Sequence, residues 1–246
     1  MIARPSQLPL DLPHRPSLTR DDLIVTQSNA LAVAAVDSWP AWPHPILLIV
    51  GPPGSGKTHL ASVWQEAADA VPFAPDRPVA ADLSRPFAVV IDDLETRLDQ
   101  EEAIFRVVNA ARLGQGAVLA TARARPADLP LRLPDLRSRL QAATITQLGA
   151  PDDTLLTAVL AKLFADRQIT IAPPLISYLV TRIERSLDAA RRVVAAVDHE
   201  ALAAKRTISR PLLQRILADT PSSFDSSDAA GYDRPSEHMD PSRPED

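Results

Sequence analysis

The chain contains no cysteine, and this absence narrows what the protein can be. Disulfides and thiolate-ligated metal sites are excluded, and a reducing cytoplasm is the simplest location for such a protein. Long hydrophobic runs are missing too, because no segment approaches the roughly 18 consecutive apolar residues of a membrane-spanning helix. The first residues lack a basic stretch followed by an apolar core, so we expect no signal peptide and no membrane association.

An excess of basic charge is missing as well. The chain has a formal net charge of −5, with 26 Lys and Arg against 31 Asp and Glu. Residues 221–246 hold seven of the acids and two of the arginines, so residues 1–220 are neutral. Neither part offers a basic platform for nucleic acid, and we expect no direct sequence-specific DNA binding. The Ser-, Pro- and Asp-rich segment 221–246 is predicted to be disordered.

What the chain does contain is an alternation of short apolar runs and helical patterns. Three runs are typical of strands buried on both faces of a parallel sheet: residues 46–50, 87–91 and 116–121. Helical patterns cover residues 57–70 and 100–113, and the pattern over 21–38 places Leu31, Ala34 and Ala35 on one face. The alternation predicts an α/β fold with a parallel sheet.

Beyond residues 149–151 (Gly-Ala-Pro) the pattern becomes helical only. Four helices are expected, over residues 152–167, 173–184, 186–205 and 209–219, with Asp152 or Asp153 capping the first. We therefore divide the chain into four parts. These are an extended N-terminal segment (1–20), an α/β nucleotide-binding core (21–150), a small all-helical domain (151–220) and an acidic tail (221–246).

The segment Gly51-Pro52-Pro53-Gly54-Ser55-Gly56-Lys57-Thr58 lies between a predicted buried strand and a helix. Glycine allows its backbone N–H groups to wrap phosphates, and the helix presents its positive N-terminus to the anion. The Lys side chain reaches the β- and γ-phosphates, and the Thr hydroxyl coordinates Mg²⁺. Three of the chain's seven glycines stand here, which argues against a chance match. We predict that ATP or ADP binds with Mg²⁺ through Gly51, Pro52, Gly54, Ser55, Gly56, Lys57 and Thr58.

Two acids, Asp92 and Asp93, end the second predicted strand. Beside a phosphate-binding loop, Asp92 is expected to hold Mg²⁺ through water and Asp93 to polarise the attacking water. The alternative is that both acids only end the strand and cap the next element.

Five segments together resemble the AAA+ branch that contains the bacterial replication initiator DnaA, and within it the shorter homologues that inactivate DnaA. They are residues 7–12 (Gln-Leu-Pro-Leu-Asp-Leu), 22–25 (Asp-Leu-Ile-Val) with Ser28-Asn29, the loop 51–58, 91–94 (Ile-Asp-Asp-Leu), and 133–140 (Leu-Pro-Asp-Leu-Arg-Ser-Arg-Leu). The resemblance covers most of residues 4–219. It implies an AAA+ core with a parallel sheet, followed by a helical lid domain.

The resemblance implies that residues 7–12 dock on the bacterial sliding clamp, the β subunit of DNA polymerase III. An extended segment restrained by neighbouring prolines loses little entropy on binding. The expected partner-binding residues are Gln7, Leu8, Leu10, Asp11 and Leu12; the alternative is a frayed N-terminus with a few leucines.

The resemblance also implies that Ile24, Val25 and Asn29 line the adenine pocket. Arg139 matches the arginine finger, which leaves its own subunit and meets the γ-phosphate held by a neighbour. Such a group stabilises charge in the transition state. Arg137 would support it or form a salt bridge, and the alternative is that both arginines are solvated surface residues.

Two positions depart from the family pattern. An acid expected shortly after the third strand is replaced, because Thr121 and Ala122 are followed by Arg123. The residue that fills the first sensor role is therefore left open, with Thr121 as the candidate. The second sensor position holds Asp188, with Arg185 and Arg191 each about one turn away. Two weakened sensors predict a poor ATPase that holds nucleotide instead of turning it over.

The function implied is negative regulation of replication initiation. The protein would be tethered to the clamp and would stimulate hydrolysis of DnaA-bound ATP by supplying Arg139. The alternatives are a loader or remodelling ATPase acting as a homo-oligomer, and an ordinary nucleotide-binding enzyme such as a kinase. The sequence leaves open ADP or ATP as the working ligand, and it is compatible with a homodimer.

Overall fold

A computed structural model describes residues 18–76, 86–204 and 208–219. The predicted clamp-binding residues 7–12 and the acidic segment 221–246 lie outside the described residues. The strands are β1 (Ile46–Val50), β2 (Val71–Pro72), β3 (Phe87–Ile91), β4 (Gly116–Ala122) and β5 (Thr144–Gln147). The helices are α1 (Ala30–Asp37), α2 (Lys57–Ala67), η1 (Leu94–Gln100), α3 (Glu101–Ala110), η2 (Ala111–Gln115), α4 (Pro134–Gln141), α5 (Asp153–Asp166), α6 (Pro173–Val180), α7 (Leu187–Ala204) and α8 (Arg210–Asp219).

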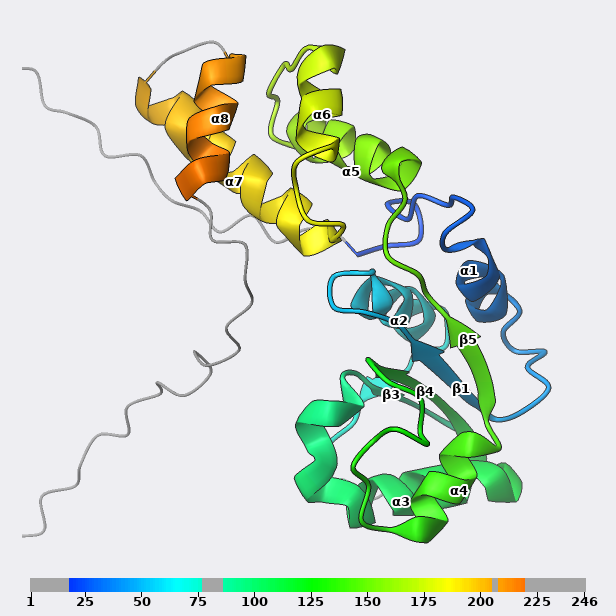
Figure 1. Cartoon of the computed structure of the whole chain (residues 1–246). Coiled ribbons are helices and arrows are strands. Elements are labelled where there is room, and N and C mark those ends of the chain that lie inside the picture. Colours follow the sequence, from blue (N-terminus) through cyan, green and yellow to red (C-terminus); the bar gives the residue numbers. More distant parts are fainter. Residues whose placement is uncertain (1–17, 77–85, 205–207, 220–246) are drawn as a thin grey trace, which may run out of the picture.

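The strands form one parallel five-stranded sheet in the order β2-β3-β4-β1-β5 (Figure 1). Strand β1 lies inside the sheet, paired with β4 and β5, and its five residues are all buried. Because side chains alternate along a strand, Ile46 and Leu48 face one layer of helices and Leu47 and Ile49 face the other. The predicted α/β class with a parallel sheet is confirmed.

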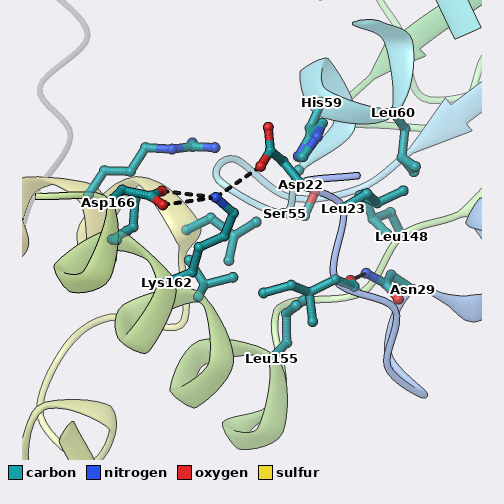
Figure 2. A pocket seen from close by; sticks show the side chains of 16 residues that line it. Asp22, Leu23, Asn29, Ser55, His59, Leu60, Leu148, Leu155, Lys162 and Asp166 are labelled. Carbon is teal, nitrogen blue, oxygen red and sulfur yellow. Dashed lines mark hydrogen bonds and ion pairs between the residues drawn. The ribbon is translucent and has the colours of Figure 1, made fainter. Parts of the chain in front are cut away.

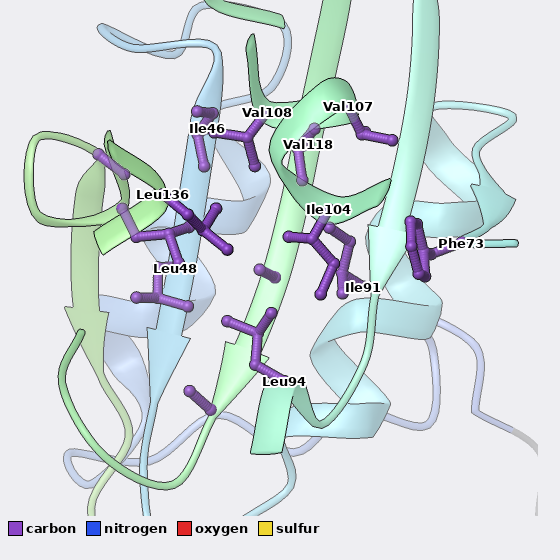
Figure 3. Close-up of a cluster of buried hydrophobic side chains, with 14 of the residues drawn as sticks. Ile46, Leu48, Phe73, Ile91, Leu94, Ile104, Val107, Val108, Val118 and Leu136 are labelled. Atoms are coloured by element: carbon purple, nitrogen blue, oxygen red, sulfur yellow. The ribbon is translucent and has the colours of Figure 1, made fainter. Parts of the chain in front are cut away.

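Helices α3 and α4 cover one face of the sheet, and α1 and α2 cover the other. On the first face Ile104, Val108 and Leu136 pack against Ile46 and Ile91, as Figure 3 shows. Residues that touch the phosphates of a parallel α/β protein lie where strands end at the carboxyl edge. This sheet places the ends of β1, β3 and β4 side by side at that edge.

The last four helices, α5 to α8, share a hydrophobic core of their own. Leu160, Phe164, Leu179 and Val194 are fully buried in it. We call α5–α8 the helical bundle. No helix among the described residues is long and apolar enough to cross a membrane.

The first helix differs from the sequence-based prediction. It begins at Ala30 instead of residue 21, and its buried face holds Ala32, Val33 and Val36. Leu31, expected on one face with Ala34 and Ala35, is 81% exposed. Small residues allow this helix to approach the sheet closely, so its largest apolar side chain was a poor guide to the buried face. The helix expected over residues 173–184 also ends earlier, at Val180.

Candidate functional site

The phosphate-binding loop lies between β1 and α2, as its sequence predicted. Gly54 and Gly56 adopt positive φ angles of 67° and 104°, which other residues rarely adopt. A Cβ atom on Gly51 would lie 2.3 Å from the Leu148 carbonyl oxygen. Ser55 Oγ is buried in this loop and finds no hydrogen-bond partner within the described part of the chain. An unsatisfied buried hydroxyl in this loop is compatible with the expected phosphate, whose oxygens would accept its hydrogen bond.

Lys57 extends back over this loop from the first turn of α2. Its ammonium donates to the carbonyl oxygens of Gly51 at 2.9 Å and Pro52 at 3.0 Å. Burial lowers the pKa of the Lys57 ammonium, while the carboxylates of Asp93 and Glu95 act in the opposite direction. The positive charge is therefore held inside the loop, close to where phosphate oxygens would lie.

The first turn of α2 and the ends of β3 and β4 bring together two hydroxyls and a carboxylate. Thr58 Oγ1 donates to Asp92 Oδ2 at 3.0 Å, and Thr121 Oγ1 donates to Asp92 Oδ1 at 2.6 Å. The buried Thr121 also accepts from the backbone N–H of Asp93 at 2.8 Å. A hydroxyl beside a carboxylate is an oxygen set that suits Mg²⁺, so the residues present fit the expected ion.

Asp93 follows Asp92 with a left-handed backbone, at φ 55° and ψ 68°. Its Oδ2 atom lies 3.1 Å from the Arg123 guanidinium. Its Oδ1 atom is buried and has no hydrogen-bond partner among residues 18–76, 86–204 and 208–219. The position of the expected water-polarising acid is thus occupied, but its carboxylate is already engaged by an arginine.

A pocket opens between the sheet core and the helical bundle, next to this loop (Figure 2). Its apolar wall joins Leu23 and Ile24 with Leu148, Leu155 and Leu187, which come from widely separated parts of the chain. Because those residues meet only in the folded chain, local sequence patterns did not single them out, apart from Ile24. An apolar slot beside a phosphate loop suits a flat, uncharged base such as adenine.

Two of the three predicted adenine-pocket residues line this pocket. Asn29 is buried and holds the segment before α1 in place, since Nδ2 donates to Ile24 O and Oδ1 accepts from Thr26 N, both at 2.8 Å. Val25 points elsewhere: it is 49% exposed and does not line the pocket.

Charged side chains rim the pocket. Lys162 of α5 lies 2.9 Å from Asp22, on the segment before α1, and 2.9 Å from Asp166. His59 Nε2 lies 3.0 Å from the Thr19 carbonyl oxygen, and burial lowers the His59 pKa. Among these residues only Asp22 lies in a segment that the sequence analysis singled out, residues 22–25.

The start of α7 rests against the phosphate loop. The Leu187 N–H donates to Gly54 O at 2.8 Å, and a Cβ on Gly54 would lie 2.0 Å from Ser186 Oγ. Of the two candidate sensor arginines, Arg191 lines the pocket and pairs with Asp188 at 2.7 Å. Arg185 is directed to Asp153, 2.8 Å away, and does not line it.

Arg139 lies in the last turn of α4, away from the pocket. Its guanidinium stacks over the Phe105 ring, 4.2 Å from the centroid, and donates to Asn109 Oδ1. Both partners belong to α3. Arg137 instead donates to the Leu131 carbonyl, so the two arginines have different environments.

No known family profile matches the chain. An uncharacterised protein of Haemophilus influenzae is 29% identical over 189 residues, which are 71% of this chain and 82% of that protein. DnaA of Cutibacterium acnes is 24% identical over 200 residues, 70% of this chain, and DnaA of Leifsonia xyli is 25% identical over 227 residues, 81% of this chain. The chain spans only 40% and 48% of the length of these two initiators.

Solved structures agree with this relationship. Domain III of Thermotoga maritima DnaA superposes with a TM-score of 0.71 at 17% identity, over 85% of this chain and 98% of that one. Aquifex aeolicus DnaA bound to AMPPCP superposes at 0.61 and 18% identity, over 78% and 69%. The Thermotoga maritima RuvB branch migration motor gives 0.61 at 20% identity, over 82% and 72%. The sheet order, the loop and these likenesses together show that this chain has the AAA+ fold in its DnaA-like form.

Proposed function

We propose that this protein is an adenine-nucleotide-binding AAA+ regulator of replication initiation, acting on DnaA in the manner of Hda, the shorter DnaA homologue. The observation that carries the proposal is the pocket between the sheet core and the helical bundle. It joins an apolar slot to a phosphate loop in which Lys57 donates to the Gly51 carbonyl oxygen and Thr58 donates to Asp92. The DnaA of Aquifex aeolicus holds AMPPCP on the same fold.

Each part of the nucleotide has a suitable surface. The base fits between Ile24, Leu148 and Leu155, and the phosphates fit the loop and the N-terminus of α2. Thr58 and Asp92 would hold Mg²⁺, which neutralises phosphate charge when bound. ADP and ATP both satisfy this chemistry.

The regulatory part of the proposal rests on where Arg139 lies. It is on the α3–α4 side of the sheet, whereas α2 lies on the other side. This separation from the chain's own phosphate loop supports a role at a nucleotide held by a neighbouring subunit. Its contacts with Phe105 and Asn109 restrain the guanidinium in the unassembled protein. In a complex with DnaA-ATP, a restrained arginine at the interface costs less entropy to insert.

The N-terminal residues complete the proposal. Residues 7–12 would bind the sliding clamp, with Gln7 donating hydrogen bonds and Leu10 and Leu12 filling an apolar pocket. Tethering to a DNA-loaded clamp raises the effective concentration of the regulator near DnaA.

The first test has two linked measurements on the full chain. Binding to purified sliding clamp is measured for the wild type and for a Gln7→Ala, Leu10→Ala variant. Hydrolysis of DnaA-bound ATP is then measured with the clamp on DNA, using Arg139→Ala and, as a matched control, Arg182→Ala, an exposed arginine in the turn after α6. We expect lost clamp binding in the first variant, and a loss of about 10³-fold in stimulation for Arg139→Ala but not for Arg182→Ala.

Different results in these two measurements would favour one of the alternative functions. If the wild type binds no clamp and does not stimulate DnaA, the regulatory proposal is wrong. A loader or remodelling ATPase would instead hydrolyse ATP rapidly by itself and form homo-oligomers.

A further inference from the structure

The second acid at the carboxyl edge of the sheet is held by an arginine from the neighbouring strand end. Strands β3 and β4 are paired, so the residues just beyond them, Asp93 and Arg123, lie side by side. The Arg123 guanidinium is 3.1 Å from Asp93 Oδ2, with about half of the Arg123 side chain and a third of Asp93 exposed.

The loop that carries Arg123 does not depend on this ion pair. Glu95 accepts from the backbone N–H of Arg123 and from that of Ala124, the latter at 3.2 Å. Thr121, inside β4, binds the backbone N–H of Asp93. Hydrogen bonds from backbone N–H groups to the Glu95 and Thr121 side chains therefore hold both strand ends without using the Arg123 guanidinium.

The pairing leaves Asp93 poorly placed to act on water. Oδ2 is held by the guanidinium, and Oδ1 is buried with no partner among the described residues. A carboxylate that orients an attacking water must present an oxygen that is both accessible and unpaired, and neither oxygen of Asp93 is both. The positive charge of Arg123 also acts at the phosphate loop, where it contributes to lowering the pKa of Lys57.

We propose that Arg123 restrains Asp93 and so makes this site bind a nucleoside triphosphate without hydrolysing it efficiently. Hydrolysis would form a bond between the water oxygen and the terminal phosphorus, break the bond to the departing nucleoside diphosphate, and release a proton from the water. Arg123 is thus a positioning residue that acts through Asp93. The inference rests on the proposed nucleotide binding. It gives the Arg123–Asp93 ion pair as the cause of the slow ATP hydrolysis that we expect of this protein.

The test compares ATP binding with single-turnover hydrolysis of Mg-ATP by the full chain. Arg123→Ala frees Asp93, and we expect the rate to rise about tenfold, a part of the roughly 10²–10⁴-fold that a well-placed general base contributes, while the ATP dissociation constant changes less than twofold. Adding Asp93→Asn to Arg123→Ala should remove the gain. Arg123→Lys keeps the charge and should keep the rate low.

Arg125→Ala is the matched control, because it removes a guanidinium from the same loop. Arg125 faces the other way, toward the Gln147 amide oxygen, at 2.7 and 3.1 Å when that amide is turned to accept. We expect the Arg125→Ala variant to match the wild type in its rate of ATP hydrolysis and in its affinity for ATP. If Arg123→Ala binds ATP normally but its rate is unchanged or lower, the inference is overturned and the proposed function stands. If the wild type binds neither ADP nor ATP, both are overturned.

Discussion

At the scale of single residues, one buried threonine organises the carboxyl edge of the sheet. Thr121 donates to Asp92 and accepts from the Asp93 backbone, so its hydroxyl joins the ends of β3 and β4. A buried hydroxyl is costly unless both its donor and its acceptor capacity are used, and here both are. The residue thus fixes the orientation of Asp92, the predicted Mg²⁺ ligand.

Single-residue contacts also distinguish Arg185 from Arg191, the two candidates for the second sensor arginine that the sequence left open. Arg191 lines the pocket, whereas Arg185 pairs with Asp153 outside it. We therefore expect Arg191→Ala to weaken nucleotide binding by roughly ten- to a hundredfold, because a charge-assisted contact contributes about 1.5–3 kcal/mol. Titration with a fluorescent ADP analogue measures the effect.

Arg185→Ala serves as the control for that titration, since it removes the same charge from the same region of the bundle. Its affinity should stay within about twofold of the wild type. Equal losses in the two variants would show that bulk positive charge, and not the position of Arg191, governs binding.

At the scale of elements, the start of α5 connects the helical bundle to the sheet core. Asp152 caps α5 by accepting from the Leu155 N–H at 2.7 Å, and its other oxygen accepts from the Ser28 N–H at 3.3 Å. The hydrogen bond from Leu155 is the main reason that the pKa of the Asp152 carboxyl is lowered. One side chain thus ends a loop, begins a helix and contacts the segment before α1.

We expect Asp152→Ala to lower the free energy of unfolding by about 1 kcal/mol at neutral pH, as for other lost helix caps. Because the folded-state pKa is depressed, this contribution is present above the ordinary aspartate pKa of about 3.9. It is lost as pH falls through the lower folded-state value. Urea unfolding at several pH values measures the difference between variant and wild type.

Asp153→Ala is the comparison for the cap, because Asp153 stands one residue later and pairs with the exposed Arg185 instead of capping. It should cost only a few tenths of a kcal/mol. A loss as large as that of Asp152→Ala would contradict the assigned cap.

At the scale of the whole molecule, the pocket wall is shared by the core, the segment before α1 and the helical bundle. Leu148 follows β5, Ile24 precedes α1, and Leu155 and Leu187 belong to the bundle. The ion pair between Lys162 and Asp22 spans the same junction. A bound nucleotide would therefore contact the sheet core and the helical bundle at the same time.

Ligand that binds only the folded state stabilises it by mass action, by about 2.7 kcal/mol at 100 times the Kd. We expect Mg-ADP at such concentrations to raise Tm by several degrees. Lys57→Ala should remove most of this rise while leaving the Tm without nucleotide within a few degrees of the wild type. Differential scanning fluorimetry provides the measurement, and an undiminished rise in the variant would exclude the phosphate loop as the binding site.

Much of the core could be predicted from local sequence. The strands at 46–50 and 87–91 were predicted at their observed bounds, because a continuous apolar run between Pro, Gly or Asp is a local signal. Strand β5 was missed, since Thr144–Gln147 is short and partly polar. The buried face of α1 was also assigned to the wrong residues, because Leu31 is large but exposed.

The sequence by itself predicted the phosphate loop and its place between a strand and a helix, since its glycines, lysine and threonine all lie within one strand-to-helix turn. It also determined the alternation that leads to a parallel sheet. Only the tertiary structure decided which side chains meet at the ends of the strands. The pairing of Asp93 with Arg123, the choice of Arg191 over Arg185 and the wall of the pocket all join residues far apart in the chain. Such contacts depend on strand order and helix packing, which no local pattern specifies.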